Sequence, residues 1–192
     1  MGEHVQAQVT TLLADWRNGD QRARNRLVSV VYDELHRIAA ASLRGESAGH
    51  TLQPTELVNE FYLRIVAPGS VRLVDRKHLF AIAARQMRRI LVDHARKRLA
   101  LSLGAGAGPL PLDEFAGLAG ASDQDAEKIV EIGMLMERLE TKHPDAARIV
   151  DMHYFGGFTL EEITKETGLT LKQVRTRWEK GLKWLKRSLH SI

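Results

Sequence analysis

TLEEITKETGLTLKQVRTRWEKGLKWLKRSL, residues 159 to 189, contains the signals that decide the fold of the C-terminal half. Thr159 followed by Glu162 is a capping box, in which the hydroxyl accepts from an amide of the first helical turn and the carboxylate accepts from the Thr159 amide. Thr170 and Gln173 repeat the pattern eleven residues later. The stretch therefore predicts two helix starts in close succession.

The residues between and after these starts predict a helix-turn-helix. Gly168 can adopt the left-handed conformation that ends one helix and turns the chain. In the second helix, apolar side chains three or four residues apart are expected to face the core: Leu171, Val174, Trp178, Leu182, Leu185 and Leu189. A second helix presented in this way fits the major groove of DNA. The candidate DNA contacts on its other side are Lys172, Gln173, Arg175, Thr176, Arg177 and Lys180. An ordinary solvated helix face remains the alternative for each of them.

The N-terminal half shows the helical repeat throughout, and the fold class predicted for the chain is all-α. Leu27, Val31, Leu35 and Ile38 follow Asp20, a candidate N-cap. Pro54 can begin a second helix, and a third is expected from about Arg76 to about Leu99. Its expected buried stripe is Leu79, Ile82, Ala83, Met87, Ile90 and Leu91, with the arginines outside. Further helices are expected over about 123–139 and 144–154.

LSLGAGAGPLPLDEFAGLAGAS, residues 101–122, separates the two halves. A stretch this rich in glycine, with two prolines, is expected to be a flexible linker rather than a helix. We therefore expect one helical domain over 1–100 and another over 123–192. The GAGAG run lacks the Gly-Lys-Ser/Thr that a phosphate-binding loop needs.

Charge is unevenly distributed along the 192 residues. The net charge is only +4, but residues 75–98 hold eight Lys or Arg against two acids, and residues 172–192 hold seven against one. Residues 123–140, by contrast, hold six acids against two basic residues. Two separate basic blocks indicate contact with a polyanion at two places.

Several classes of protein fit the sequence poorly. There is no cysteine, which excludes disulfides, thiolate metal sites and a cysteine nucleophile. No metal-binding histidine pair or carboxylate pair stands out, so we expect neither an enzyme nor a cofactor. The N-terminus lacks the pattern of a secretory signal, and no run is apolar enough for a membrane span. A protein of the cytoplasm without membrane contact is expected.

The order of these parts resembles the extracytoplasmic-function type of bacterial RNA polymerase sigma factor. DELHRIAAASLR, LQPTELVNEFYLRI and HLFAIAARQMRRILVDHARKR are similar to successive parts of sigma domain two. HYFGGFTLEEITKETGLTLKQVRTRWEKGLKWLK is similar to sigma domain four. The likeness runs from about Val9 to Leu189 and is greatest to a subgroup bearing Leu-Gln-Pro-Thr.

The resemblance implies RNA polymerase core and promoter DNA as partners. The helix after Pro54 would dock on the clamp helices of the polymerase through Glu56, Leu57, Asn59, Glu60 and Leu63. The basic third helix would engage the promoter element near minus ten through Arg85, Arg88, Arg89, Asp93, His94, Arg96 and Arg98. The loop around Val71 to His78 would help to capture a flipped base, and the helix at Lys172 to Lys180 would bind duplex DNA near minus thirty-five.

The start of the polymerase-binding helix departs from the resembling family, whose members often carry a cluster of acids there. This chain has Thr51 and Thr55 with Glu56 instead. A phosphate on either threonine would supply negative charge near a helix N-terminus, where the helix dipole favours it. The hypothesis is activation by a serine/threonine kinase, with Thr51 the favoured site. Simple helix capping by the two threonines is the alternative.

Two further interpretations remain open. A free-standing helix-turn-helix regulator would share the C-terminal motif but would leave the first hundred residues without a role. A closed arrangement of the two halves could mask the polymerase-binding face. An anti-sigma factor is a further candidate partner that the sequence does not identify.

Overall fold

The computed structural model describes residues 2–44, 52–67, 73–104 and 123–189, and every regular element in these ranges is helical. The N-terminal half contains α1 (Gly2–Arg17), α2 (Gln21–Ser42), α3 (Pro54–Val66) and α4 (Arg76–Gly104). The C-terminal half contains α5 (Asp123–Lys142), α6 (Pro144–Val150), the π-helical turn η2 (Asp151–Phe155), α7 (Leu160–Thr167) and α8 (Leu171–Leu189). The predicted all-α class is confirmed. In the described part of the chain, we find no helix with the length and apolar character of a membrane span.

The predicted helix starts of the N-terminal half are also confirmed. Asp20 caps α2, since its side chain accepts from the amides of Arg22 and Ala23 at 2.7 and 3.2 Å. Pro54 is the first residue of α3, and the Gln53 amide donates to the Glu56 carboxylate at 2.7 Å. These starts depend on contacts within three residues, which is why the local sequence predicts them.

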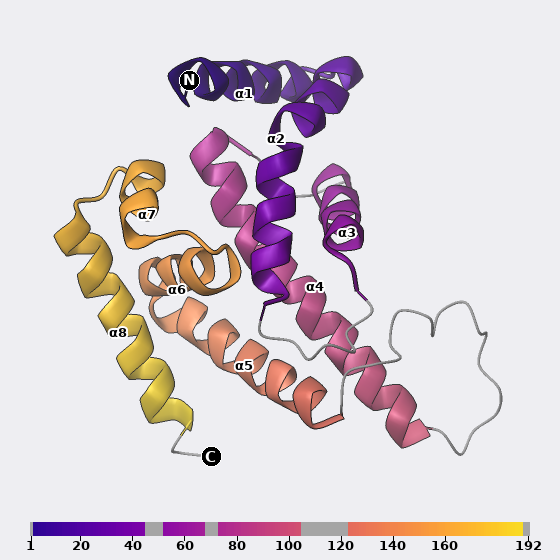
Figure 1. Ribbon diagram of the computed structural model, residues 1–192, viewed down its shortest axis with the longest axis vertical. Coiled ribbons are helices and arrows are strands. Elements are labelled where there is room, and N and C mark those ends of the chain that lie inside the picture. Colours follow the sequence, from indigo (N-terminus) through magenta and orange to yellow (C-terminus); the bar gives the residue numbers. More distant parts are fainter. Residues whose placement is uncertain (1, 45–51, 68–72, 105–122, 190–192) are drawn as a thin grey trace.

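The long helix α4 crosses the molecule and packs against helices of its own N-terminal half and of the C-terminal half. It packs against α2 and α3 on one side and against α5 and η2 on another, and Figure 1 shows α5 alongside it. The six residues predicted as its buried stripe are all buried. A second row of α4 is buried as well: Phe80, Ala84, Arg88, Val92 and Ala95.

The largest apolar core is shared by the two halves. Buried residues of η2, α7 and α8, together with Phe158, belong to the same cluster as those of α1 to α4. Phe158 is 3% exposed, and its ring lies 6.5 Å from that of Phe80. The division into two domains therefore remains a proposal, since the structure joins the halves through a common core.

Three predicted boundaries differ from the structure. Helix α4 continues to Gly104, so the first residues of the predicted linker are helical, while 105–122 lie outside the described residues. Arg76 to His78 belong both to the helix expected from about Arg76 and to the loop that the resemblance implied, and they form the first turn of α4, where the Asp75 side chain accepts from the His78 amide at 2.7 Å. The helix predicted over 144–154 changes to the π-helical turn η2 after Val150.

Candidate nucleic-acid interface

The helix-turn-helix forms as its capping residues predict. The Glu162 amide donates to the Thr159 hydroxyl at 3.1 Å, and the Thr159 amide donates to the Glu162 carboxylate at 2.8 Å. Gly168 ends α7 with φ of 74°, in the left-handed region. The turn therefore presents the start of α8 at a defined angle to α7.

The second capping pair fixes the first turn of α8. The Thr170 amide donates to the Gln173 side-chain oxygen at 2.9 Å, and the Gln173 amide donates to the Thr170 hydroxyl at 3.3 Å. Most of the predicted DNA contacts on this helix are exposed: Lys172, Gln173, Arg175, Thr176 and Lys180. Arg177 is half-buried and lies near Asp145 of α6, at 3.7 Å between Nε and Oδ2. The start of α8 thus carries an exposed row of cations and hydrogen-bonding side chains.

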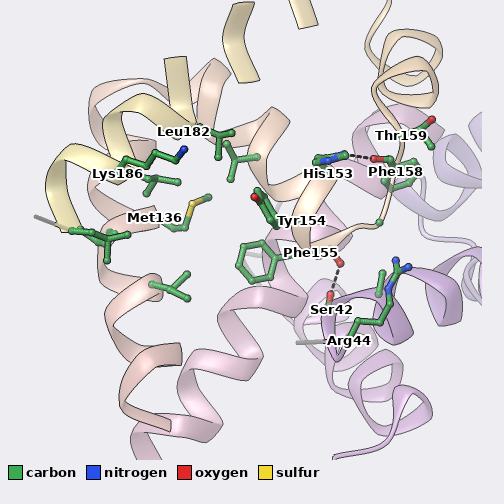
Figure 2. Close-up of a pocket in the computed structure, with 17 residues that line it drawn as sticks. Ser42, Arg44, Met136, His153, Tyr154, Phe155, Phe158, Thr159, Leu182 and Lys186 are labelled. Atoms are coloured by element: carbon green, nitrogen blue, oxygen red, sulfur yellow. Dashed lines mark hydrogen bonds between the residues drawn. The ribbon is translucent and has the colours of Figure 1, made fainter. Parts of the chain in front are cut away.

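The apolar face of α8 is only partly buried, which corrects one prediction. Val174 is buried, but Leu182 and Leu185 are half-buried and Leu189 is 45% exposed. Beyond Val174 the helix borders an open cleft of about 750 Å³, lined also by α5, η2 and the end of α2. Figure 2 shows Leu182 and Lys186 on the α8 side of this cleft, with Met136 and Phe155 across it. Helical periodicity correctly identified the apolar face but could not show that no element of the described residues covers its end.

Of the α4 arginines that were predicted to lie outside the buried stripe, Arg88 is buried, which corrects the prediction for this residue. All five that were assigned to promoter DNA pair with acids of the C-terminal half. Arg85, Arg88 and Arg89 contact Glu140, with nitrogen–oxygen distances of 3.8 Å for Arg88 and 3.2 Å for Arg89. Arg96 lies 3.6 Å from Glu137, and Arg98 lies 3.2 Å from Asp123. In this structure these arginines face protein carboxylates.

Arg88 is the most buried of them. Its side chain is 1% exposed, and its Nε donates to Asp151 Oδ1 at 2.6 Å. Burial raises the pKa of Asp151, and the charge and hydrogen bond of Arg88 oppose that shift. The π-helical turn η2 begins at Asp151, where it directs this carboxylate into the interface. Arg88 therefore cannot contact DNA from its present position.

The remaining polar residues predicted on α4 connect it to α3. Asp93 Oδ2 accepts from Arg64 Nη2 at 2.7 Å, and His94 Nε2 lies 2.6 Å from Glu60 Oε1. Helix α4 was assigned to DNA and α3 to the polymerase. The Arg64–Asp93 and Glu60–His94 contacts therefore fix the candidate DNA surface relative to the candidate polymerase surface.

Helix α3 presents a partly polar face to solvent. Glu56 and Asn59 are exposed, Glu60 is half-exposed, and Leu63 is 64% exposed. Leu57 has no exposure and packs in the main core, which corrects its assignment to the polymerase-binding face. It lies on the same helical face as Phe61 and Ile65, which are also buried. The candidate docking face therefore consists of the other four residues.

Comparison with protein families shows which family this arrangement of helices belongs to. A family model described as ECF sigma factor matches residues 6–191. The chain belongs to the ECF sigma factor family. As a sigma factor it acts in transcription initiation, binding core RNA polymerase and promoter DNA. A search of curated proteins and a search of solved structures found no significant match.

Of the two threonines proposed as phosphorylation sites, Thr55 is among the described residues and Thr51 is not. Thr55 is exposed in the first turn of α3. Thr55 does not cap the helix, because Gln53 is the N-cap residue and the Glu56 carboxylate accepts from the Gln53 amide. Thr51 lies outside the described residues, as do Val71 and Arg72 of the predicted base-capturing loop.

Sequence reasoning missed the acids that hold the α4 arginines. Glu140 and Asp151 lie 51 and 63 residues from the arginines with which they form hydrogen bonds. A local pattern cannot pair them. The only signal in the sequence was the acidic character of residues 123–140, which matches the basic character of residues 75–98. Within the described residues, no group of three or more potential metal ligands occurs.

Proposed function

We propose that this sigma factor uses three separate helices to begin transcription at specific promoters. Helix α8 would bind duplex DNA near minus thirty-five, α4 would engage the element near minus ten, and α3 would dock on the clamp helices of the polymerase. The exposed start of α8 is the observation that carries this proposal. A free-standing regulator would not need the exposed α3 face.

The contacts of α8 divide by their position along the helix. Gln173, Arg175 and Thr176 lie near its N-terminal end, where side chains of a recognition helix reach base edges. Arginine suits a bidentate contact with guanine, whereas Gln173, whose side-chain oxygen accepts from Thr170, retains its NH2 group as a donor to a base. Lys172 and Lys180 are proposed to contact phosphates, which position the protein without selecting sequence.

The two proposed promoter contacts differ in how accessible their side chains are. The α8 residues are exposed, whereas Arg85, Arg88 and Arg89 of α4 are held by Glu140 and Asp151. Contact with the element near minus ten therefore requires these pairs to exchange for DNA phosphates. The polar pair Asp93 and His94 would remain tied to α3 during that exchange.

Phosphorylation of Thr51 or Thr55 is the regulatory part of the proposal. Glu56 is the only acid in the first turn of α3, and its carboxylate is occupied by the Gln53 amide. A phosphate would add about −1.5 to −2 charges at pH 7 beside the positive end of the helix dipole. The exposed side chain of Thr55 would be accessible to a kinase. An anti-sigma factor remains a proposed partner.

Reconstitution with core polymerase tests the main proposal. The purified chain is expected to co-purify with core enzyme and to direct run-off transcription from a subset of promoters, identified by sequencing the bound DNA. A chain that binds DNA but never associates with core polymerase would favour the free-standing regulator instead.

The phosphorylation proposal has its own test. Thr51→Ala with Thr55→Ala is expected to abolish promoter output in cells while leaving the purified protein folded. Thr141→Ala is a matched control, because Thr141 is exposed on α5 and distant in sequence from α3. Unchanged core binding and promoter output in the double variant would reject the switch.

A further inference from the structure

The contact between the two halves covers the side of α4 that carries the arginines assigned to promoter DNA. Helix α5 runs beside α4, and η2 packs against α4 and α2. Gly133 permits the close approach, since a Cβ at that position would lie 2.6 Å from a methyl carbon of Val92. The Ser42 hydroxyl donates to the Phe155 carbonyl at 2.6 Å, and Arg37 donates to the Gly157 carbonyl at 3.2 Å. Backbone and side chains of the C-terminal half therefore hold this arrangement.

The carboxylates at this contact offer the arginines the same kind of anionic oxygen as DNA phosphates. A carboxylate, like a phosphate, presents anionic oxygens to the planar donors of a guanidinium. Glu140 receives three arginines and Asp151 receives the most buried one. The same nitrogen atoms cannot bind these carboxylates and DNA phosphates at once. The two kinds of contact are mutually exclusive.

The contact also leaves some donors unsatisfied. Arg85 Nε and Arg88 Nη1 are buried and have no hydrogen-bond partner among the described residues. Unsatisfied buried donors are unfavourable, which reduces the net stability of the closed contact. Exchange for a polyanion with many oxygens is therefore feasible, although Phe158 and its neighbours keep the halves together in its absence.

The candidate polymerase-binding face is arranged differently. Helix α3 packs on α2 and α4, and Leu63 and Asn59 remain exposed in the same closed structure. The C-terminal acids are thus placed against the DNA-facing arginines and not against this docking face. The structure separates access to the polymerase from access to the promoter.

We infer that Glu140 and Asp151 form an intramolecular substitute for promoter phosphates, which keeps the isolated chain closed to DNA at α4 while α3 stays open to polymerase. The inference rests on the proposed function of α3 and α4. It implies an order of events in which the closed chain docks on the polymerase first, and the arginines of α4 then exchange Glu140 and Asp151 for DNA.

One test releases the arginines. Glu140→Gln removes the charge that three arginines share, and Glu127→Gln is the matched control because Glu127 is an exposed acid on the same helix. The probe is a short fluorescent DNA duplex of random sequence, titrated at several salt concentrations. The Glu140 variant is expected to bind more tightly, with a salt slope steeper by about one to two units, one for each additional phosphate that Arg85 or Arg89 neutralises, since Arg88 stays paired with Asp151. Equal behaviour of the two variants would overturn the inference.

A second test locks the contact. The chain has no cysteine, and a Cβ at Gly133 would lie 3.3 Å from the Cβ of Val92, close to the spacing of a disulfide. The Val92→Cys, Gly133→Cys variant is expected, when oxidised, to bind core polymerase but to support no promoter-dependent transcription until it is reduced. Each single variant controls for the substitutions themselves. Full transcription by the oxidised form, or loss of its core binding, would overturn the inference.

These tests are separable from the proposed function. If the unmodified chain fails to associate with core polymerase, the proposed function is wrong. The duplex titration still decides whether Glu140 masks the arginines, because that measurement requires no polymerase.

Discussion

Helices α4 and α8 are both rich in arginine, yet they offer their charges to different partners. The arginines predicted for DNA on α4 face Glu137, Glu140, Asp123 and Asp151 of the same chain. Lys172, Arg175 and Lys180 on α8 are exposed. The difference arises because α4 is covered on two sides and α8 on one. A count of basic residues therefore shows where a polyanion could bind, but not whether the site is open.

The largest expected effect concerns Arg88, the most buried arginine of α4. Arg88→Met leaves Asp151 without its partner in the interior and is expected to lower the free energy of unfolding by about 3–5 kcal/mol. Urea denaturation measures the loss. The double variant Arg88→Met, Asp151→Leu is expected to recover most of it, because no buried charge then lacks a partner. A loss below about 1 kcal/mol in the single variant would show that Asp151 does not need Arg88 as a partner in the interior.

Arg175 provides the contrasting case on α8. Because Arg175 is exposed, Arg175→Ala is expected to leave stability within about 0.5 kcal/mol. Its effect should appear in promoter binding, with a loss of about 1–3 kcal/mol and a relaxed preference at one base position. Fluorescence anisotropy with cognate and altered duplexes measures both. In the matched variant Lys180→Ala, a sequence-independent loss with a shallower salt slope is expected. Identical losses from the two variants would contradict the division between base and phosphate contacts.

Two left-handed glycines sharpen the comparison between the halves. Gly168 and Gly19 have φ of 74° and 97°, and a Cβ at either would meet nothing within 4 Å. Alanine at either position is therefore expected to destabilise only through backbone strain, by about 1–2 kcal/mol. Gly168→Ala should also weaken DNA binding, since it changes the angle at which α8 begins. Gly19→Ala should not. Thermal denaturation and DNA titration of the pair provide the measurement.

The smallest expected effect concerns the helix caps. Thr159→Ala removes the hydroxyl that accepts from the Glu162 amide and is expected to destabilise α7 by about 1 kcal/mol. Asp20→Ala removes the corresponding acceptor of α2 in the N-terminal half. Similar losses of stability are expected from both, measured by urea denaturation. A loss confined to one half would mean that the two halves unfold separately, despite their common core.

The predicted and observed structures agree where the determining contacts are local. The two helix starts of the helix-turn-helix were predicted correctly because capping boxes and a left-handed glycine act within three or four residues. Leu57 was assigned wrongly to the docking face because a resemblance identifies a helix, whereas burial decides which of its side chains are exposed. Leu189 was placed wrongly in the core because periodicity identifies a face without showing what covers it.

The sequence by itself determined the helical class, the starts of α2, α3, α7 and α8, and the helix-turn-helix, since these follow from side chains that bond to neighbouring amides. Only the tertiary structure decided that Arg88 is buried and that Glu140 and Asp151 hold the arginines of α4. An amphipathic pattern specifies one buried face, and α4 has two because α5 and η2 fold back over it. Interactions between residues far apart in the chain have no local signature, and so the pairing of the α4 arginines with these carboxylates became visible only in the folded molecule.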